Sequence, residues 1–132
     1  MSRRAQLSKA ELEVARIVWS LSGATVRQVH EALPEDRSLD YKTVQTYLRR
    51  LEAKGYLHAR RQGKSIHYRP RVRPTQVVRE TVEDFLSRLF DGEALPLVEY
   101  LIADHGLSDD EIARLRVMLA QRESEQHDHR KR

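Results

Sequence analysis

The sequence predicts a mainly α-helical protein that carries one small β-hairpin. Two observations predict this class: apolar residues recur at helical spacing in six segments, and two short alternating segments flank a glycine turn. With 132 residues, the chain suits one compact domain or a small domain with an appendage. Its 39% hydrophobic and 33% charged residues allow only a modest core, and the lack of cysteine excludes disulfides and thiolate metal sites.

Capping residues place the first three helices. Two capping boxes, in which a serine or threonine is followed three residues later by a glutamate or glutamine, start at Ser8 and Thr25. They predict helices over about 9–21 and 26–33. Asp40 is the predicted N-cap of a third helix, which Gly55 ends as its C-cap after residues 41–54.

Two strands are predicted next, over residues 57–61 and 65–69, around a turn that contains Gly63. We expect the hairpin to rest on the helices through Leu57, Ile66 and Tyr68. Three short helices followed by a hairpin are the pattern of a winged helix-turn-helix. In that fold the third helix enters the DNA major groove and the hairpin lies along the backbone.

The third predicted helix has two chemically different sides. One side carries an apolar stripe of Val44, Leu48 and Leu51. The other side and its flanks carry cations, hydroxyls and an amide, and there Lys and Arg suit guanine and phosphate, Gln suits adenine, and the Thr methyl suits thymine. The predicted DNA contacts from this helix are Tyr41, Lys42, Thr43, Gln45, Thr46, Arg49 and Arg50. The alternative is an ordinary solvated face, although such a face usually includes acids.

The hairpin is rich in positive charge. Arg60, Arg61 and Lys64 suit phosphate binding, and His67 can hydrogen-bond a phosphate. The alternative is an edge hairpin whose cations only prevent aggregation. Because the charge has one sign, we favour a role in binding the DNA backbone.

Charge divides the chain into a basic and an acidic part. Residues 1–74 hold 16 Lys and Arg against 7 Asp and Glu, whereas residues 75–132 hold 8 against 13. The basic part suits a polyanion, and the acidic part would be repelled by phosphate. We therefore predict a DNA-binding domain over 1–74, a helical dimerisation domain over 75–123 and a disordered tail over 124–132.

The predicted dimerisation domain contains amphipathic helices over about 75–90, 93–104 and 108–123. These helices are too short to make an independent core easily, and a two-fold dimer would bury their apolar side chains against their copies. The alternative is a cap on the DNA-binding domain of the same chain. The predicted dimerisation residues are Val78, Val82, Phe85, Leu86, Leu89, Leu97, Val98, Leu101, Ile102, Leu115 and Leu119.

No pattern in the sequence indicates an enzyme, a cofactor or a metal site. No serine or histidine lies in a catalytic motif, and there is no glycine-rich phosphate loop. His127 and His129 flank one acid, but two imidazoles on a terminal segment do not make a closed metal site. Without a signal peptide or an apolar run of membrane-spanning length, we expect a cytoplasmic protein with no membrane partner.

Three stretches, 7–19, 41–55 and 85–92, resemble the BlaI/MecI/CopY family of bacterial repressors, the penicillinase-repressor family. The second stretch contains the motif Thr-Val-Gln-Thr-x-Leu-x-Arg-Leu-x-x-Lys-Gly, which is fairly specific for this family. The likeness to the family runs from about residue 7 to 123. It implies a dimer on a dyad operator and inactivation by proteolysis, through a regulatory protease, or by metal. It also implies DNA contacts from the positions that match Lys42, Thr43 and Thr46.

Two departures from the family bear on regulation. Copper-responsive members carry a C-terminal cysteine cluster, which this chain lacks, so direct copper sensing by that route is excluded. In β-lactam-responsive members a membrane sensor-protease is associated with cleavage at an Asn-Phe bond. The corresponding positions here are Tyr100 and Leu101, which does not favour cleavage at this point and leaves the inducer open.

The sequence therefore predicts a sequence-specific DNA-binding transcriptional repressor that acts as a homodimer on a palindromic operator. Repression rather than activation rests on the family likeness alone, so a winged-helix activator is an alternative. A protein-interaction module that uses its basic face on an acidic protein partner is an alternative from a different class. The salt dependence of DNA binding distinguishes these classes.

Overall fold

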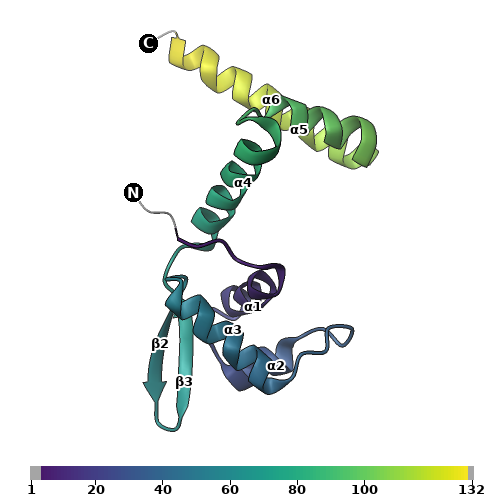
Figure 1. Ribbon diagram of the computed structural model, residues 1–132. Helices are drawn as coiled ribbons and strands as arrows, with labels where there is room; N and C mark the ends of the chain where they lie inside the picture. Colours follow the sequence, from purple (N-terminus) through teal and green to yellow (C-terminus); the bar gives the residue numbers. More distant parts are fainter. Residues whose placement is uncertain (1–3, 131–132) are drawn as a thin grey trace. The chain divides into compact units, whose positions relative to one another are not determined.

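Three helices and a three-stranded sheet make up the first of two units in the structure (Figure 1). The computed structural model describes residues 4–130, and the two units meet between Val82 and Glu83, inside helix α4. The first unit comprises α1 (Lys9–Ser20), β1 (Ala24–Thr25), α2 (Val26–Ala32), α3 (Tyr41–Ala53), β2 (Leu57–Gln62), β3 (Ser65–Pro70) and the first turns of α4 (Pro74–Phe90).

The predicted capping boxes are present at the starts of α1 and α2. The Ser8 hydroxyl accepts from the Glu11 N–H at 3.2 Å, and the Glu11 carboxylate accepts from the Ser8 N–H at 2.8 Å. Thr25 and Gln28 exchange the same two bonds at 3.2 and 2.9 Å. These bonds satisfy backbone N–H groups that a helix end leaves without partners, so the helices begin where the sequence predicted.

The sheet has the order β1-β3-β2 and contains a strand that the sequence did not reveal. In β1, Ala24 pairs with Tyr68 and Thr25 with His67, both antiparallel. The preceding Gly23 has φ +118°, and a Cβ atom at this position would lie 2.7 Å from the His67 ring. Glycine therefore permits both the backbone turn and the close approach that brings β1 alongside β3.

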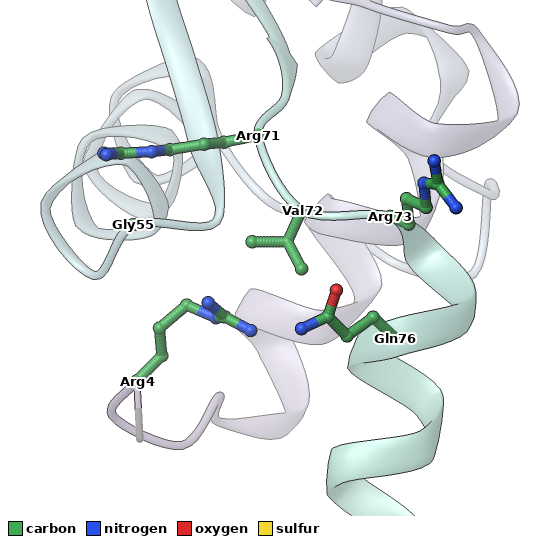
Figure 2. Close-up of a pocket in the computed structure, with 6 residues that line it drawn as sticks. All are labelled: Arg4, Gly55, Arg71, Val72, Arg73 and Gln76. Atoms are coloured by element: carbon green, nitrogen blue, oxygen red, sulfur yellow. The ribbon is translucent and has the colours of Figure 1, made fainter. Parts of the chain in front are cut away.

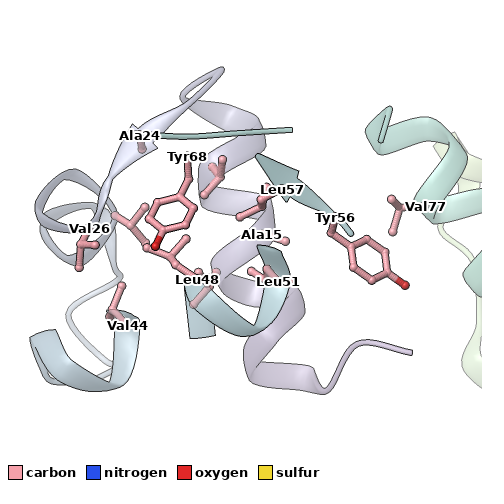
Figure 3. Close-up of a cluster of buried hydrophobic side chains, with 13 residues drawn as sticks. Ala15, Ala24, Val26, Val44, Leu48, Leu51, Tyr56, Leu57, Tyr68 and Val77 are labelled. Carbon is pink, nitrogen blue, oxygen red and sulfur yellow. The ribbon is translucent and has the colours of Figure 1, made fainter. Parts of the chain in front are cut away.

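The core of the first unit lies between its helices and its sheet (Figure 3). Val77 of α4 joins this core with only 3% of its surface exposed, in the same cluster as Tyr56. The first turns of α4 are therefore packed on the first unit. The largest fully buried side chains are Tyr68, Leu48, Leu51, Leu57, Val14, Val18, Val29 and Val44.

The hairpin differs from the prediction at Ile66. Leu57 and Tyr68 are buried as expected, but Ile66 is 39% exposed. Ile66 pairs with Arg61 one step from the turn, whereas Tyr68 pairs with Ala59 further along the hairpin. The expectation that Ile66 rests on the helices is therefore wrong, because the burial of the hairpin ends before its tip.

The second unit contains the rest of α4, α5 (Leu95–Tyr100), the π-helix η1 (Leu101–His105) and α6 (Asp109–Arg130). The single helix predicted over 93–104 is thus interrupted at Leu101, where the backbone widens into a π-helical turn. At the start of α6, the side chains of Ser108 and Glu111 form the predicted capping box with distances of 3.1 and 3.0 Å.

Helix α6 is longer than the sequence predicted. It continues to Arg130, so the disorder predicted for 124–132 is wrong over 124–130, and residues 131–132 lie outside the described part of the chain. The segment has no apolar periodicity, but it contains no glycine or proline, and its Glu, Gln and Arg residues favour a helix. Within residues 4–130, no helix is long and apolar enough to cross a membrane.

Candidate nucleic-acid interface

Helix α3 is fixed at its N-terminal end by Asp40. The Asp40 carboxylate accepts a hydrogen bond from the Thr43 N–H at 2.9 Å. Hydrogen bonding from Thr43, together with the nearby charges of His30 and Lys42, holds the pKa of Asp40 below its ordinary value. Asp40 therefore fixes where α3 begins, because its carboxylate satisfies an N–H group of the first turn.

The two sides of α3 are separated as the sequence predicted. Val44, Leu48 and Leu51 are 0% exposed and form part of the core. Lys42, Thr46 and Arg49 lie on the solvent-exposed side of the helix. The side of α3 that is predicted to contact DNA is thus accessible to solvent in the first unit. None of these three side chains on it is acidic.

Thr46 has a restricted hydrogen-bonding role. Its hydroxyl donates to the backbone carbonyl of Lys42 at 3.0 Å, so its donor is already used within the helix. The exposed part of the side chain therefore presents a methyl group and an acceptor oxygen. A methyl group suits the C5-methyl of thymine, and the acceptor suits an exocyclic amine in the major groove.

The flanks of this face carry aromatic and amide groups. Thr43 and Gln45 are half-buried, whereas Tyr41 is exposed and packs edge-on against His30 with ring centroids 6.0 Å apart. The Arg50 guanidinium lies over the Tyr47 ring at 5.8 Å. Such contacts restrict the side chains and lower the entropic cost of binding a ligand.

The hairpin places three predicted cations at or near its tip. Arg60 and Arg61 precede the turn and Lys64 lies within it, and all three are exposed without an ion-pair partner in the described residues. His67 is different, because it is half-buried and pairs with Thr25 of β1. The three cations therefore lie along the outer part of the hairpin, with Arg60 and Arg61 on opposite faces of β2, and His67 lies nearer the body of the unit.

The opposite end of α3 is held by a contact that the sequence analysis missed. Lys54 donates to the Glu11 carboxylate at 2.7 Å and to the Gln6 carbonyl at 3.0 Å. Burial alone would raise the pKa of Glu11, but hydrogen bonds from Lys54 and Ser8 outweigh it and leave the pKa below its ordinary value. Only the capping pattern at Glu11 was visible in the sequence, and it gave no sign of this second role.

The candidate interface carries a strong excess of positive charge. Residues 41–70, which span α3 and the hairpin, hold eight Lys and Arg and a single acid, Glu52. A surface of this composition attracts a polyanion such as the DNA backbone.

Comparison with known proteins agrees with this geometry. Residues 7–121 match the model of a family described as penicillinase repressor. The chain belongs to that family. A penicillinase repressor of Bacillus licheniformis is 30% identical over 132 residues, which cover all of this chain and 99% of the relative. A methicillin resistance regulatory protein MecI of Mammaliicoccus sciuri is 29% identical over 114 residues, 86% of this chain and 93% of the relative.

A solved structure extends the comparison to the fold. The DNA-binding domain of the repressor BlaI is 33% identical, with a TM-score of 0.50 over 57% of this chain and 92% of that domain. The helical and hairpin elements of the first unit therefore confirm the predicted winged helix-turn-helix class. In this member of the penicillinase repressor family, α3 is the third helix of the first unit and directly precedes the hairpin of β2 and β3.

The second unit of this family member exposes much of its apolar surface. Among the predicted dimerisation residues, Leu86 is buried within the chain, and Leu97, Leu101 and Leu115 are half-buried. The exposed ones are Val78 and Val82, in the part of α4 that belongs to the first unit, and Phe85, Leu89, Val98, Ile102 and Leu119 in the second. The second unit also exposes four apolar side chains that were not predicted as dimerisation residues, Leu95, Tyr100, Val117 and Met118.

Proposed function

We propose that this chain is a sequence-specific DNA-binding transcriptional repressor that acts as a homodimer on a palindromic operator. The observation that carries the proposal is the exposed face of α3, where Lys42, Thr46 and Arg49 lie opposite a fully buried stripe. Membership of the penicillinase repressor family and similarity to a BlaI DNA-binding domain support it.

In the proposed complex, α3 enters the major groove and the hairpin contacts the backbone. Lys42 and Arg49 supply donors for guanine edges or phosphates, and Thr46 supplies its methyl and acceptor oxygen. Gln45 reaches an adenine edge from the flank of the helix. Arg60, Arg61 and Lys64 bind phosphates, which fixes the position of the protein without specifying sequence.

The proposed homodimer forms through the second unit. Exposed apolar side chains such as Phe85 and Leu89 are costly in water, and a symmetric interface buries each set against its copy. A two-fold dimer presents two copies of α3 to successive major grooves about 34 Å apart. Such a protein selects an operator with two inverted half-sites.

Selection of bound DNA from a random pool tests this function. The full-length chain is incubated with random duplexes at about 150 mM salt, near physiological ionic strength, and the retained duplexes are sequenced through successive rounds. We expect enrichment of one palindrome whose half-sites are separated by about one helical turn. A pool that stays random although the protein retains DNA would contradict sequence-specific binding, and a protein that retains no DNA would contradict the function altogether.

A further inference from the structure

A cavity of about 550 Å³ lies in the first unit, and its lining includes none of Lys42, Thr46 and Arg49. We call it the basic cavity, and its lining residues are Arg4, Gly55, Arg71, Val72, Arg73 and Gln76. Figure 2 shows Arg4 and Gln76 extending towards each other below Val72, while Arg71 extends beside the turn at Gly55. Residues from three separate segments of the chain thus surround one space.

The basic cavity carries more positive charge than its surroundings neutralise. The Arg4 guanidinium pairs with Glu80, at 2.8 and 2.9 Å from the two carboxylate oxygens. Arg71 and Arg73 are exposed, and among the described residues neither has an ion-pair partner. Figure 2 shows the Arg71 and Arg73 side chains extending in opposite directions, away from Arg4. The lining therefore holds two unpaired guanidinium groups besides the Arg4–Glu80 pair, and a cleft with one sign of charge concentrates counter-ions.

Arg4 is held in place and keeps an unused donor. Its guanidinium lies over the Tyr56 ring at 5.6 Å, and its Cδ is 3.7 Å from where a Cβ on Gly55 would be. Its Nε–H is buried and has no hydrogen-bond partner in the described structure. A buried donor without a partner is costly, so a shift of the Arg4 side chain that gives this N–H an acceptor from a ligand would offset an existing penalty.

The basic cavity lies far from the start of α3 and from the hairpin tip. Gly55 follows the last turn of α3, and a 13-residue helix separates it by about 20 Å from the end at Tyr41. Arg71 follows β3, whose six residues span about 20 Å from the hairpin tip. Arg49, at the other end of the proposed DNA-binding face, lies about 9 Å from Gly55 along the helix. Competition with DNA therefore tests whether the two surfaces are separate.

We propose that the basic cavity binds a small anion with at least two negative charges, carried by phosphate or carboxylate groups. Guanidinium groups bind both kinds of oxyanion with paired hydrogen bonds, and the Gln76 amide adds a donor beside Arg4. The long side chains of Arg71 and Arg73 can turn towards the bound anion. Such a ligand joins the N-terminal segment, the β3–α4 connection and the first turn of α4.

Isothermal titration calorimetry with the full-length chain tests the proposal without DNA. Pyrophosphate and citrate are titrated separately at constant ionic strength, which distinguishes a phosphate site from a carboxylate site. We expect saturable binding of one anion per chain for at least one of them. Arg71→Ala and Arg73→Ala should each raise Kd about tenfold, as the loss of a charge-assisted hydrogen bond implies.

Arg79→Ala is the matched control, because Arg79 is an exposed arginine on α4 that does not line the basic cavity. It should leave Kd unchanged. Equal weakening by all three variants would overturn the proposal, as would the absence of saturable binding for both anions. Release of bound pyrophosphate by a short DNA duplex would also overturn it, since the cavity would then belong to the DNA interface. None of these outcomes depends on whether an operator exists.

Discussion

Lys54 Nζ lies 2.7 Å from Glu11 Oε1, and this ion pair joins the C-terminal end of α3 to the first turn of α1. Glu11 is 2% exposed and also completes the capping box with Ser8. Asp40 caps the other end of α3. The helix proposed to enter the major groove is therefore capped at its start, joined to α1 at its end and held along its buried stripe.

Replacing the buried carboxylate should destabilise the protein. Glu11→Gln keeps the side-chain length but removes the charge that faces Lys54, which should lower the free energy of unfolding by about 1–3 kcal/mol at neutral pH. Urea unfolding monitored by circular dichroism measures this change. Glu35→Gln is the control, since Glu35 is exposed in the loop before α3 and its change should stay within about 0.5 kcal/mol. Equal effects of the two variants would contradict the role assigned to Glu11.

The same ion pair predicts a pH dependence. Folding lowers the pKa of Glu11 below 4.5, so its contribution to stability is complete above pH 4.5 and disappears as the pH falls through the folded-state pKa. Wild type should therefore lose stability in acid more steeply than Glu11→Gln. Urea unfolding at several values between pH 3 and 6, a range of about three units around the carboxyl titration, measures the difference. Parallel curves for the two proteins would contradict this assignment.

Thr46 and Lys64 should affect DNA binding differently. Thr46→Ala removes a group that faces the bases and should reduce the preference for the selected operator by about 1 kcal/mol. Lys64→Ala removes a phosphate contact, so it should weaken binding to every sequence alike and lower the salt slope by about one. Fluorescence anisotropy with operator and scrambled duplexes measures both effects. A uniform loss by both variants on all sequences would contradict the division between helix and hairpin.

Thr46→Ser provides a sharper control for the same position. The serine hydroxyl can still donate to the Lys42 carbonyl, as Thr46 does at 3.0 Å, but the methyl is absent. If the methyl contacts a base, Thr46→Ser should lose nearly as much operator preference as Thr46→Ala. Full retention of preference by Thr46→Ser would assign the contact to the acceptor oxygen instead.

Operator binding should weaken strongly with salt. If a dimer neutralises about 6–10 phosphates, its affinity should fall by about 10³–10⁵ between 50 and 200 mM salt. The slope of log Kd against log salt concentration, measured by anisotropy, gives the number of phosphate contacts. A slope near zero would contradict an interface dominated by Arg60, Arg61 and Lys64.

A charge placed on the exposed apolar surface of α4 should prevent dimerisation. Leu89→Glu puts a carboxylate where the proposed interface buries a leucine, and sedimentation velocity should show a monomer with weakened operator binding. Ser87→Glu is the control, because Ser87 is exposed and points to a different side of the helix from Leu89. A dimer that survives Leu89→Glu would place the interface elsewhere.

Local signals in the sequence were sufficient to predict the helix starts and the winged helix-turn-helix class. Ser8, Thr25, Asp40 and Ser108 all cap the helices that they were predicted to begin, because a cap depends only on residues within one turn. The buried stripe of α3 followed from its periodicity alone. Each of these features depends on residues that are close to one another in the sequence.

Features that depend on contacts between residues far apart in the sequence could not be predicted. Strand β1 has two residues and exists only through pairing with β3, so it has no alternation of its own. The ion pair of Glu11 with Lys54 joins positions 43 residues apart. The basic cavity likewise gathers Arg4, Gly55 and Arg71 from separate segments, and no spacing in the sequence indicates their meeting.

The role of the exposed face of α3 in DNA recognition can be tested by replacing its side chains with alanine while the buried side of the helix stays unchanged. In the triple variant Lys42→Ala/Thr46→Ala/Arg49→Ala, the side chains of Val44, Leu48 and Leu51 are unchanged, so the melting temperature should stay close to that of wild type. The ratio of affinities for the selected operator and a scrambled duplex, measured at one salt concentration, should fall to about one. A folded triple variant that keeps the wild-type ratio would show that another surface recognises the DNA sequence.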